Sequence, residues 1–326
     1  MIEVTVADDS AVAEARRRAA ELGAAAGFGE LRAGQLAIVA TELSTNLLKH
    51  ADGGKLLIGA GEAHVDLLAL DRGAGMADVE RCLADGYSSA GTPGNGLGAV
   101  RRMAHRFHVA SWPGRGTAVF ARLLRNGAAP DASDEVGAVE MAKAGEVVCG
   151  DAWALHRDAT QCTLFMVDGL GHGSQAALAA NEAVSQFRRS RTDMPVDILQ
   201  AVHLAIRHTR GGAVAVARID YAASTVVYAG LGNIAASLAA PSGHLRRMVS
   251  LNGTAGHNAR KIQAFEYPCG DGLLIMHTDG ITSSWTLEPY PGFARLHPML
   301  LAGLLMRDHS RGRDDATVVV ARTHAP

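Results

Sequence analysis

The sequence predicts an α+β protein of two domains, and three observations lead to this prediction. The chain has 326 residues, which exceeds the length at which a single hydrophobic core grows efficiently. Residues 125–137 read RNGAAPDASDEVG, a stretch poor in large apolar side chains and typical of an exposed connection. After it, candidate strands cluster and helices come in pairs, without βαβ alternation. We therefore expect domains at 1–125 and 138–326, joined by a linker at 126–137.

The composition is that of a folded protein without a basic binding surface. Hydrophobic residues make up 48% and charged residues 20% of the chain, and the mean hydropathy is +0.07, which excludes a mainly disordered chain. A formal net charge of -2 gives no basic field, so we expect no direct nucleic-acid contact. No signal-peptide pattern, apolar membrane span or zinc-type cysteine spacing is present. The sequence thus predicts a cytoplasmic protein with reduced cysteines and no membrane contact.

The N-terminal half is predicted to layer helices on one mixed sheet. Apolar residues recur at helical spacing in Val12–Leu22 and Leu31–His50, the latter with a stripe at positions 36, 39, 43 and 47. Shorter segments are expected to form strands, with a hairpin turn at GEAH between the first two; they are residues 55–60, 64–70, 107–111 and 117–124.

The C-terminal half is predicted to be a two-sheet core, a β-sandwich flanked by helices. The expected strands are residues 145–149, 163–167, 213–219, 225–229, 273–277 and 316–321. The expected helices are residues 175–188, 196–208 and 293–306.

Polar residues occupy one face of the second predicted helix. Glu42 and Asn46 are one turn apart, and Lys49 and His50 follow three and four positions later. A carboxylate and a carboxamide at this spacing can hold a hydrated Mg²⁺, and the carboxylate can also orient or deprotonate a nucleophile. For this helix alone, a solvated surface explains the pattern better.

Two glycine-containing segments change that balance. The sequence DRGAGM at residues 71–76 directly follows an apolar strand, where glycines let a ligand approach the backbone, and Asp71 is then a carboxylate for recognition of a base. Residues 91–98 read GTPGNGLG and run into a predicted helix, whose free amides can bind phosphate. Together with the polar helix face, these segments predict a nucleotide site.

The segments TELSTNLLKHADGG, DRGAGM and GNGLGAVRRM resemble, in this order, the N-box and the two glycine boxes of the Bergerat (GHKL) ATPase fold, and more narrowly the RsbT-type switch kinases. This resemblance implies an α/β sandwich that binds ATP with Mg²⁺. It implies that Asn46 coordinates Mg²⁺, that Glu42 is the general base toward a protein hydroxyl, and that Asp71 bonds the adenine amino group. The other nucleotide contacts that it implies are Lys49, Gly73, Gly75, Gly94, Gly96, Leu97 and Gly98.

Residues 78–92 are expected to form a lid over the nucleotide. Arg101 and Arg102 follow in the next predicted helix. They contact phosphate or a partner in one interpretation and are solvated in the other, which is the commoner situation for surface arginines.

Acidic residues recur at the ends of apolar strands in the C-terminal half. Asp151, Asp168 and Asp279 each follow such a run, and the pair Asp314 and Asp315 precedes another. Oxygen ligands suit Mn²⁺ and Mg²⁺, and two such ions can activate water and clamp a phosphate. Any single Asp-Gly pair is equally well explained as an ordinary turn. The recurrence of the pattern predicts a metal site.

The segments GDAW, DGLGHG, AGLGNI, HTDGI and RDDATVVVAR resemble metal-dependent PPM-type phosphatases of the SpoIIE group, and in particular the compact RsbX-like phosphatases. The resemblance implies that Asp168 bridges two Mn²⁺ or Mg²⁺ ions and that the Gly169 carbonyl joins them. Asp151, Asp279 and Asp314 would complete the cluster, with Asp315 left as the alternative to Asp314.

Three further expectations concern the surroundings of this cluster. His172 acts near the leaving group or makes a structural hydrogen bond, and the sequence leaves both interpretations open. Gly230–Ile234 is expected to be a structural turn. Because no arginine precedes Asp151 at the place where larger eukaryotic phosphatases hold the substrate phosphate, the metals alone are expected to bind it.

Taken together, the resemblances predict a bifunctional regulator of a partner-switching pathway, with ATP-dependent protein Ser/Thr kinase activity and metal-dependent phosphoserine/phosphothreonine phosphatase activity. The expected substrate is a STAS-domain anti-sigma antagonist or a stressosome-type protein, and a homodimer is left open. One alternative keeps the phosphatase and makes the N-terminal domain a non-catalytic ATP sensor. Another makes it an ATP-tuned module that sequesters a partner or a sigma factor.

Overall fold

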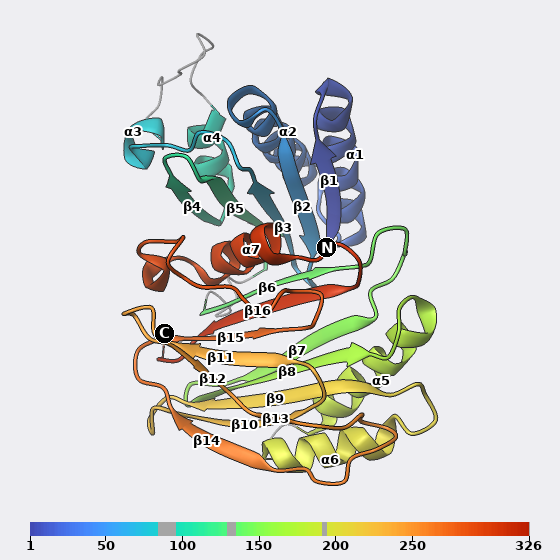
Figure 1. The fold of residues 1–326 in the computed structure, drawn as a ribbon. Helices are drawn as coiled ribbons and strands as arrows, with labels where there is room; N and C mark the ends of the chain where they lie inside the picture. Colours follow the sequence, from blue (N-terminus) through green and yellow to red (C-terminus); the bar gives the residue numbers. More distant parts are fainter. Residues whose placement is uncertain (84–95, 129–134, 191–193, 326) are drawn as a thin grey trace. The chain divides into compact units, whose positions relative to one another are not determined.

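The computed structural model describes residues 1–83, 96–128, 135–190 and 194–325. It divides into two compact units, Met1–Ala132 and Ser133–Pro326 (Figure 1). Part of the predicted linker, residues 129–134, lies outside the described residues, so the limits of the linker stay a prediction. No helix in the described part of the chain is long and apolar enough to cross a membrane.

The N-terminal unit is a five-stranded sheet in the order β1-β2-β3-β5-β4, with α1, α2 and α4 packed against it. Its strands are β1 (Ile2–Val6), β2 (Gly54–Ala60), β3 (His64–Leu70), β4 (Arg106–Trp112) and β5 (Gly116–Leu124). Its helices are α1 (Asp9–Ala25), α2 (Glu30–Ala51), α3 (Val79–Leu83) and α4 (Gly96–Met103). Every neighbouring pair is antiparallel, so the expectation of a mixed sheet was wrong. The order follows from two hairpins, β2-β3 and β4-β5, since a short connection can only join antiparallel strands.

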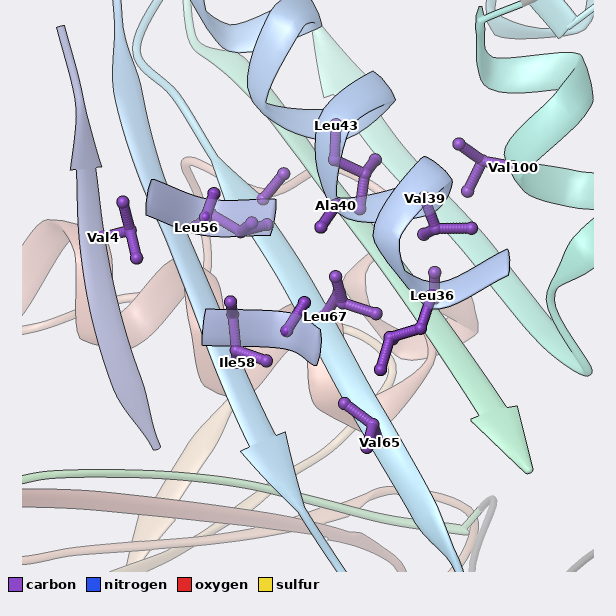
Figure 2. Packing of buried hydrophobic residues seen from close by; sticks show 14 of the residues in the cluster. Val4, Leu36, Val39, Ala40, Leu43, Leu56, Ile58, Val65, Leu67 and Val100 are labelled. Carbon is purple, nitrogen blue, oxygen red and sulfur yellow. The ribbon is translucent and has the colours of Figure 1, made fainter. Parts of the chain in front are cut away.

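The core of this unit lies between the sheet and one stripe of α2 (Figure 2). The predicted stripe is confirmed, because its four members are at most 3% exposed; they are Leu36, Val39, Leu43 and Leu47. The strands contribute alternate residues to the same cluster, including Leu56, Ile58, Val65 and Leu67. The burial of this stripe fixes the rotation of α2, so its polar residues Glu42 and Asn46 lie only partly buried.

The C-terminal unit contains two sheets. The six-stranded sheet has the order β13-β10-β9-β8-β7, with β14 also paired to β10, and the five-stranded sheet has the order β12-β11-β15-β16-β6. The strands of the first are β7 (Asp151–Arg157), β8 (Gln161–Gly169), β9 (Gly212–Asp220), β10 (Thr225–Leu231), β13 (Ser250–Leu251) and β14 (Ala264–Pro268). Those of the second are β6 (Val136–Met141), β11 (Ala235–Ala239), β12 (Leu245–Arg247), β15 (Leu273–His277) and β16 (Ala316–Arg322).

Strand β8 shows how one sequence serves both faces of its sheet. Leu164 and Met166 belong to the apolar cluster shared with the five-stranded sheet, whereas Phe165 and Val167 belong to the cluster shared with the helices. The helices that pack on the six-stranded sheet are α5 (Ser174–Arg189) and α6 (Pro195–Ala205), and α7 (Pro298–His309) packs on β6 and β16. The predicted β-sandwich flanked by helices is therefore confirmed.

Two predicted elements were wrong. The segment Gly145–Cys149 is a loop, not a strand, and its Val147 side chain is 97% exposed, so its apolar residues do not mark a buried strand. The predicted helix over residues 293–306 is instead a short 3-10 turn at Phe293–Arg295 followed by α7. The helix begins at Pro298, because proline suits a first helical turn but cannot continue a helix.

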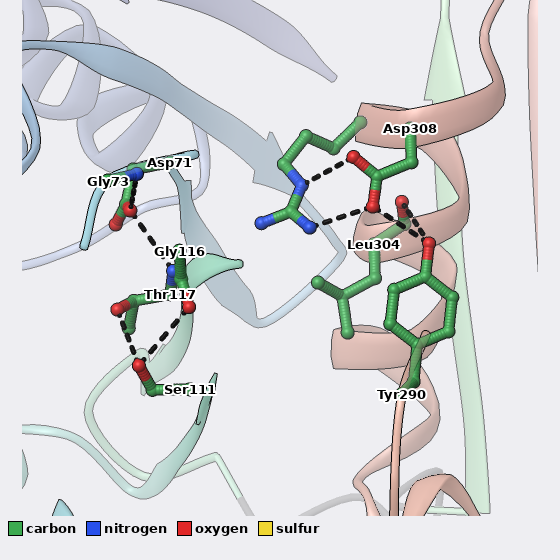
Figure 3. A network of polar contacts seen from close by, with 9 residues as sticks. Asp71, Gly73, Ser111, Gly116, Thr117, Tyr290, Leu304 and Asp308 are labelled. Carbon is green, nitrogen blue, oxygen red and sulfur yellow. Dashed lines mark hydrogen bonds and ion pairs between the residues drawn. The ribbon is translucent and has the colours of Figure 1, made fainter. Parts of the chain in front are cut away.

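The loop before α7 is fastened to that helix by a tyrosine. The Tyr290 hydroxyl donates a hydrogen bond to Asp308 Oδ2 at 2.8 Å, and the Arg307 guanidinium pairs with the same carboxylate at 2.7 Å (Figure 3).

The α2 stripe provides a test of the N-terminal core. The substitution Leu36→Ala should lower the free energy of unfolding of this unit by about 2–5 kcal/mol, because it leaves a cavity under the sheet. Leu31 lies on the same helix but is 73% exposed, so Leu31→Ala should change stability by less than about 0.5 kcal/mol. Amide hydrogen exchange of β2 and β3 in the full chain measures both. Equal protection losses in the two variants would contradict this assignment of the core.

Candidate functional site

Three predicted nucleotide-site residues from separate elements come together in the N-terminal unit. Glu42 and Asn46 lie one turn apart on α2, and Gly96 is the first residue of α4. A Cβ placed on Gly96 would lie 3.4 Å from Glu42 Oε2 and 3.5 Å from Asn46 Oδ1. The start of α4 therefore faces the polar side of α2, at ordinary van der Waals distance from the side chains of Glu42 and Asn46.

The Asn46 carboxamide is incompletely satisfied by the protein. Its Nδ2 atom is buried and has no hydrogen-bond partner among the described residues. A buried donor without a partner is costly, and such groups mark sites where a ligand or water completes the bonding. The two ends of an amide are interchangeable by a flip, so this side chain can offer either its oxygen to Mg²⁺ or its nitrogen to a phosphate. The residues present fit a nucleotide with its metal.

Asp71 is held rigidly at the end of β3 (Figure 3). Its Oδ1 accepts hydrogen bonds from the backbone amides of Gly73 at 2.8 Å and Thr117 at 3.1 Å. The Thr117 hydroxyl in turn lies 2.8 Å from that of Ser111. The carboxylate is thus oriented by two neighbouring segments of chain, as a residue that recognises one edge of a base requires.

The glycines after Asp71 have a structural reason in this fold. A Cβ on Gly73 would come within 2.7 Å of Ala51 Cα, and one on Gly75, where φ is +70°, would collide with the backbone at Trp112. These two glycines therefore allow neighbouring chain segments to approach, which sequence reasoning had attributed to the ligand.

The remaining predicted nucleotide contacts are placed less directly. Lys49 is exposed in the last turn of α2, Leu97 packs against the apolar core, and Gly98 is buried in α4. Gly94 lies outside the described residues, as does the greater part of the predicted lid at 78–92. Leu97 is only partly buried, so its contact with a nucleotide stays a prediction.

In the C-terminal unit two of the predicted acidic residues lie directly opposite each other. Asp151 in β7 and Asp168 in β8 are cross-strand partners, a position that brings side chains on one face close together. Asp151 is 3% exposed, and its Oδ2 accepts a hydrogen bond from the Thr278 hydroxyl at 2.7 Å. The strand ends thus bring two carboxylates together, as the sequence predicted.

The other carboxylates come from the five-stranded sheet. Asp279 follows β15, and its Oδ2 accepts a hydrogen bond from Asn233 Nδ2 at 2.7 Å. Asp315 is 4% exposed, and its two oxygens accept the backbone amides of Lys143 at 2.8 Å and Gly150 at 2.9 Å. Asp314 is exposed beside it. The two neighbours therefore differ, since Asp315 is used to hold the loop before β7 and Asp314 is not.

Burial and mutual repulsion raise the pKa values of the two paired carboxyls. Removal from water is the largest cause for Asp151, followed by repulsion from Asp168, and together they raise its pKa to about 8. Removal from water is also the largest cause for Asp168, with repulsion from Asp279, Asp314 and Asp315 adding to it, and its pKa rises to about 7. A cation that neutralised this group of charges would remove the repulsion.

These residues form an oxygen-rich site that is not a closed metal cage. Among the described residues, no three His, Cys, Asp or Glu side chains already converge as a metal centre would require. The donors nevertheless suit a hard divalent cation, because they are carboxylates and a backbone carbonyl. Gly169 is required by the packing of the backbone, since a Cβ there would collide with the Ala176 carbonyl oxygen and lie 2.9 Å from the Gly150 carbonyl oxygen.

Sequence reasoning missed two residues that touch the acidic group. Asn233 was assigned to a structural turn, yet its side chain binds Asp279, and Thr278 was not considered although it links Asp151 to β16 through the Thr317 amide at 3.0 Å. The sequence offered two signals for these residues. One was the carboxamide of Asn233 at the end of GLGN, and the other was the hydroxyl of Thr278 directly before Asp279. For His172, the structure gives a hydrogen bond from Nδ1 to Glu146 at 2.6 Å.

Comparison with known families assigns the two parts of the chain to different families. Residues 5–123 match the histidine kinase-like ATPase domain, and residues 158–324, just over half of the chain, match the stage II sporulation protein E (SpoIIE) family.

Two proteins of Bacillus subtilis (strain 168) are similar to the two parts. The serine/threonine-protein kinase RsbT is 30% identical over 99 residues, which cover 29% of this chain and 74% of RsbT. The phosphoserine phosphatase RsbX is 23% identical over 146 residues, which cover 44% of this chain and 72% of RsbX.

Solved structures agree with these relationships. A chain solved in work on the bacterial stressosome and secondary-messenger signalling is 30% identical, with a TM-score of 0.53, and the match covers 58% of this chain and 98% of that one. RsbX in complex with magnesium is 20% identical, with a TM-score of 0.51 over 57% of this chain and 92% of its own, and this likeness concerns the fold alone. The chain therefore belongs to the SpoIIE family of PPM-type phosphatases through its C-terminal unit and joins to it an RsbT-type GHKL ATPase domain.

Proposed function

We propose that this protein sets the phosphorylation level of a partner-switching protein, with a kinase site in the N-terminal unit and a phosphoserine/phosphothreonine phosphatase site in the C-terminal unit. The phosphatase half rests on one observation, the group of mutually repelling carboxylates around Asp168. The proposed substrate is a STAS-domain or stressosome-type protein, since a solved chain 30% identical to this one comes from work on the bacterial stressosome. The proposed compartment is the cytoplasm.

Asp151, Asp168, Asp279, Asp314 and the Gly169 carbonyl are the proposed ligands of two Mg²⁺ or Mn²⁺ ions. Asp314 is favoured over Asp315 because both Asp315 oxygens already accept backbone hydrogen bonds. Bound ions would supply Lewis-acid activation of water and neutralise phosphate charge. Thr278 and Asn233 hold Asp151 and Asp279 in place through the hydrogen bonds described above.

A protein substrate fits the surface next to this site better than a small metabolite does. Three apolar side chains on the loops around Asp168 and on the start of α5 are exposed, namely Val147 (97%), Leu170 (57%) and Leu178 (45%). Contiguous exposed apolar surface is typical of sites that bind another protein, and these three side chains would contribute to such a surface.

The substitution Asp168→Asn should lower the phosphatase rate by more than about 100-fold. Loss of an outer-shell partner of a metal ligand costs up to about 100-fold, and loss of a direct ligand should cost more. Hydrolysis of p-nitrophenyl phosphate and of a phosphorylated STAS-domain protein with Mg²⁺ or Mn²⁺ measures this. Asp271 also belongs to an Asp-Gly pair but is exposed in a turn, so Asp271→Asn should retain full activity. If Asp168→Asn hydrolysed both substrates at the rate of Asp271→Asn, the metal site would be misplaced.

The kinase half rests on the meeting of Glu42, Asn46 and Gly96. Glu42 lies beside the start of α4, where a nucleotide phosphate would be bound by helix amides. A carboxylate in this position can take the proton of a hydroxyl that attacks the phosphate. A domain that served only to sense ATP would need Asn46 and the glycines but would not need Glu42.

The substitution Glu42→Gln should reduce phosphate transfer to the partner by at least about 100-fold while ATP binding stays within about threefold, because a general base acts on the rate and not on binding. Phosphate incorporation and nucleotide affinity are measured in an Asp168→Asn background, so that dephosphorylation does not hide the product. Glu62 is exposed in the hairpin between β2 and β3, so Glu62→Gln is the matched control. Unchanged incorporation in Glu42→Gln would favour the ATP-sensing alternative.

The raised pKa values of Asp151 and Asp168 predict a pH-dependent stability without metal. Unfolded carboxyls titrate near 3.8, whereas the folded ones titrate at about 8 and about 7. Between these limits the folded state binds more protons, so its stability falls as pH rises. In chelator, the Tm of the C-terminal unit should drop by at least about 5 °C between about pH 5 and about pH 8.

Saturating Mg²⁺ should remove most of this slope, because metal binds the ionised carboxylates. Scanning calorimetry with and without EDTA measures it, and Asp168→Asn should flatten the slope without metal. A slope that was the same in this variant and in the parent protein would show that other groups cause it.

A further inference from the structure

Arg210 lies at a chain corner that is fixed on both sides. Its carbonyl accepts a hydrogen bond from His257 Nε2 at 2.9 Å, and the carbonyl of the next residue, Gly211, accepts one from the Leu170 amide at 2.9 Å. This second bond joins the corner before β9 to the loop that follows Asp168. The backbone of Arg210 is therefore held next to the proposed phosphatase site.

The side chain of Arg210 extends along the same loop. Its Nη1 atom lies 3.3 Å from the point that a Cβ on Gly171 would occupy. Gly171 is three residues after Asp168 and has φ of +91°. A glycine at this place leaves room for the guanidinium, which a larger residue would displace.

The charges around the site make a cation useful there. Asp151, Asp168, Asp279, Asp314 and Asp315 make this site rich in carboxylates, and a phosphate monoester would bring further negative charge to it. In the described part of the chain, the Arg210 guanidinium makes no hydrogen bond or ion pair with the protein. Its donors match the oxygens of a phosphoryl group, which arginine binds through paired hydrogen bonds.

We propose that Arg210 binds the phosphoryl group of the phosphoserine or phosphothreonine substrate at the C-terminal site. The proposal rests on the proposed phosphatase function. In larger eukaryotic phosphatases, an arginine before the residue equivalent to Asp151 holds the substrate phosphate. The proposal assigns this role to Arg210, which follows α6. The metals alone then need not carry the whole charge of the substrate phosphate.

The test compares Arg210→Ala, Arg210→Gln and Arg210→Lys with Arg207→Ala, a control three residues earlier that is also exposed. With saturating Mg²⁺, the alanine and glutamine variants should raise KM for p-nitrophenyl phosphate, and the inhibition constant of inorganic phosphate, by about 10- to 100-fold. The value of kcat should change by less than about threefold, because the lost contact exists already in the bound substrate. Lysine should restore most of the affinity, and Arg207→Ala should match the parent.

A second readout does not depend on turnover. Calorimetric titration of the Mg²⁺-loaded full chain with inorganic phosphate should show binding that Arg210→Ala weakens, while the Tm rise on Mg²⁺ addition stays unchanged. Phosphate binding through Arg210 in a parent protein that hydrolyses nothing would support this inference and reject the proposed function.

Two results would overturn the inference. One is that Arg210→Ala and Arg207→Ala have the same KM and phosphate affinity, or that the parent protein does not bind phosphate. The other is that the effect belongs to Arg313, the exposed arginine next to Asp314, so that Arg313→Ala loses phosphate affinity and Arg210→Ala does not.

Discussion

The cross-strand placement of Asp151 and Asp168 is the constraint on which the C-terminal site depends. Like charges directly opposite each other in an antiparallel pair destabilise a sheet, and here both groups are also largely removed from water. The pair can persist in only two ways, with protons or with a cation. Without metal, pKa values of about 8 and about 7 leave the pair partly protonated near neutral pH, so a cation bound there would have to displace protons.

The surrounding chain keeps this unfavourable arrangement in place. Thr278 and Asp315 tie β7 and the loop before it to the five-stranded sheet, so the two sheets are joined by hydrogen bonds at the same end where the carboxylates meet. The loop at 145–149 follows from this, because the chain has to present the Lys143 and Gly150 amides to one carboxylate. Val147 and Val148 of this loop are exposed, at 97% and 42%.

The layers and most elements could be predicted from the sequence, because they depend on local periodicity. The α2 stripe and strand β8 are examples, since each buries its apolar residues at the expected spacing. The loop at 145–149 could not, because its apolar composition is that of a strand and only the distant Asp315 explains its path. Asn233 escaped prediction for a similar reason, since its side chain contacts Asp279 from a part of the chain far away in sequence.

The two units meet the problem of phosphate charge differently, and this bears on how their activities can be combined. In the N-terminal unit, the proposed ligand is ATP, which brings its own Mg²⁺. It would bind to the helix amides and to the Asn46 amide, whose Nδ2 has no partner among the described residues. In the C-terminal unit, the proposed phosphatase site would need resident cations to offset the negative charge of its carboxylates before a phosphate binds. Divalent cations therefore serve both proposed reactions, so their concentration favours one reaction only where the two sites differ in metal affinity. The proposed kinase reaction would also consume ATP and the unphosphorylated partner, whereas the proposed phosphatase reaction would consume the phosphorylated partner.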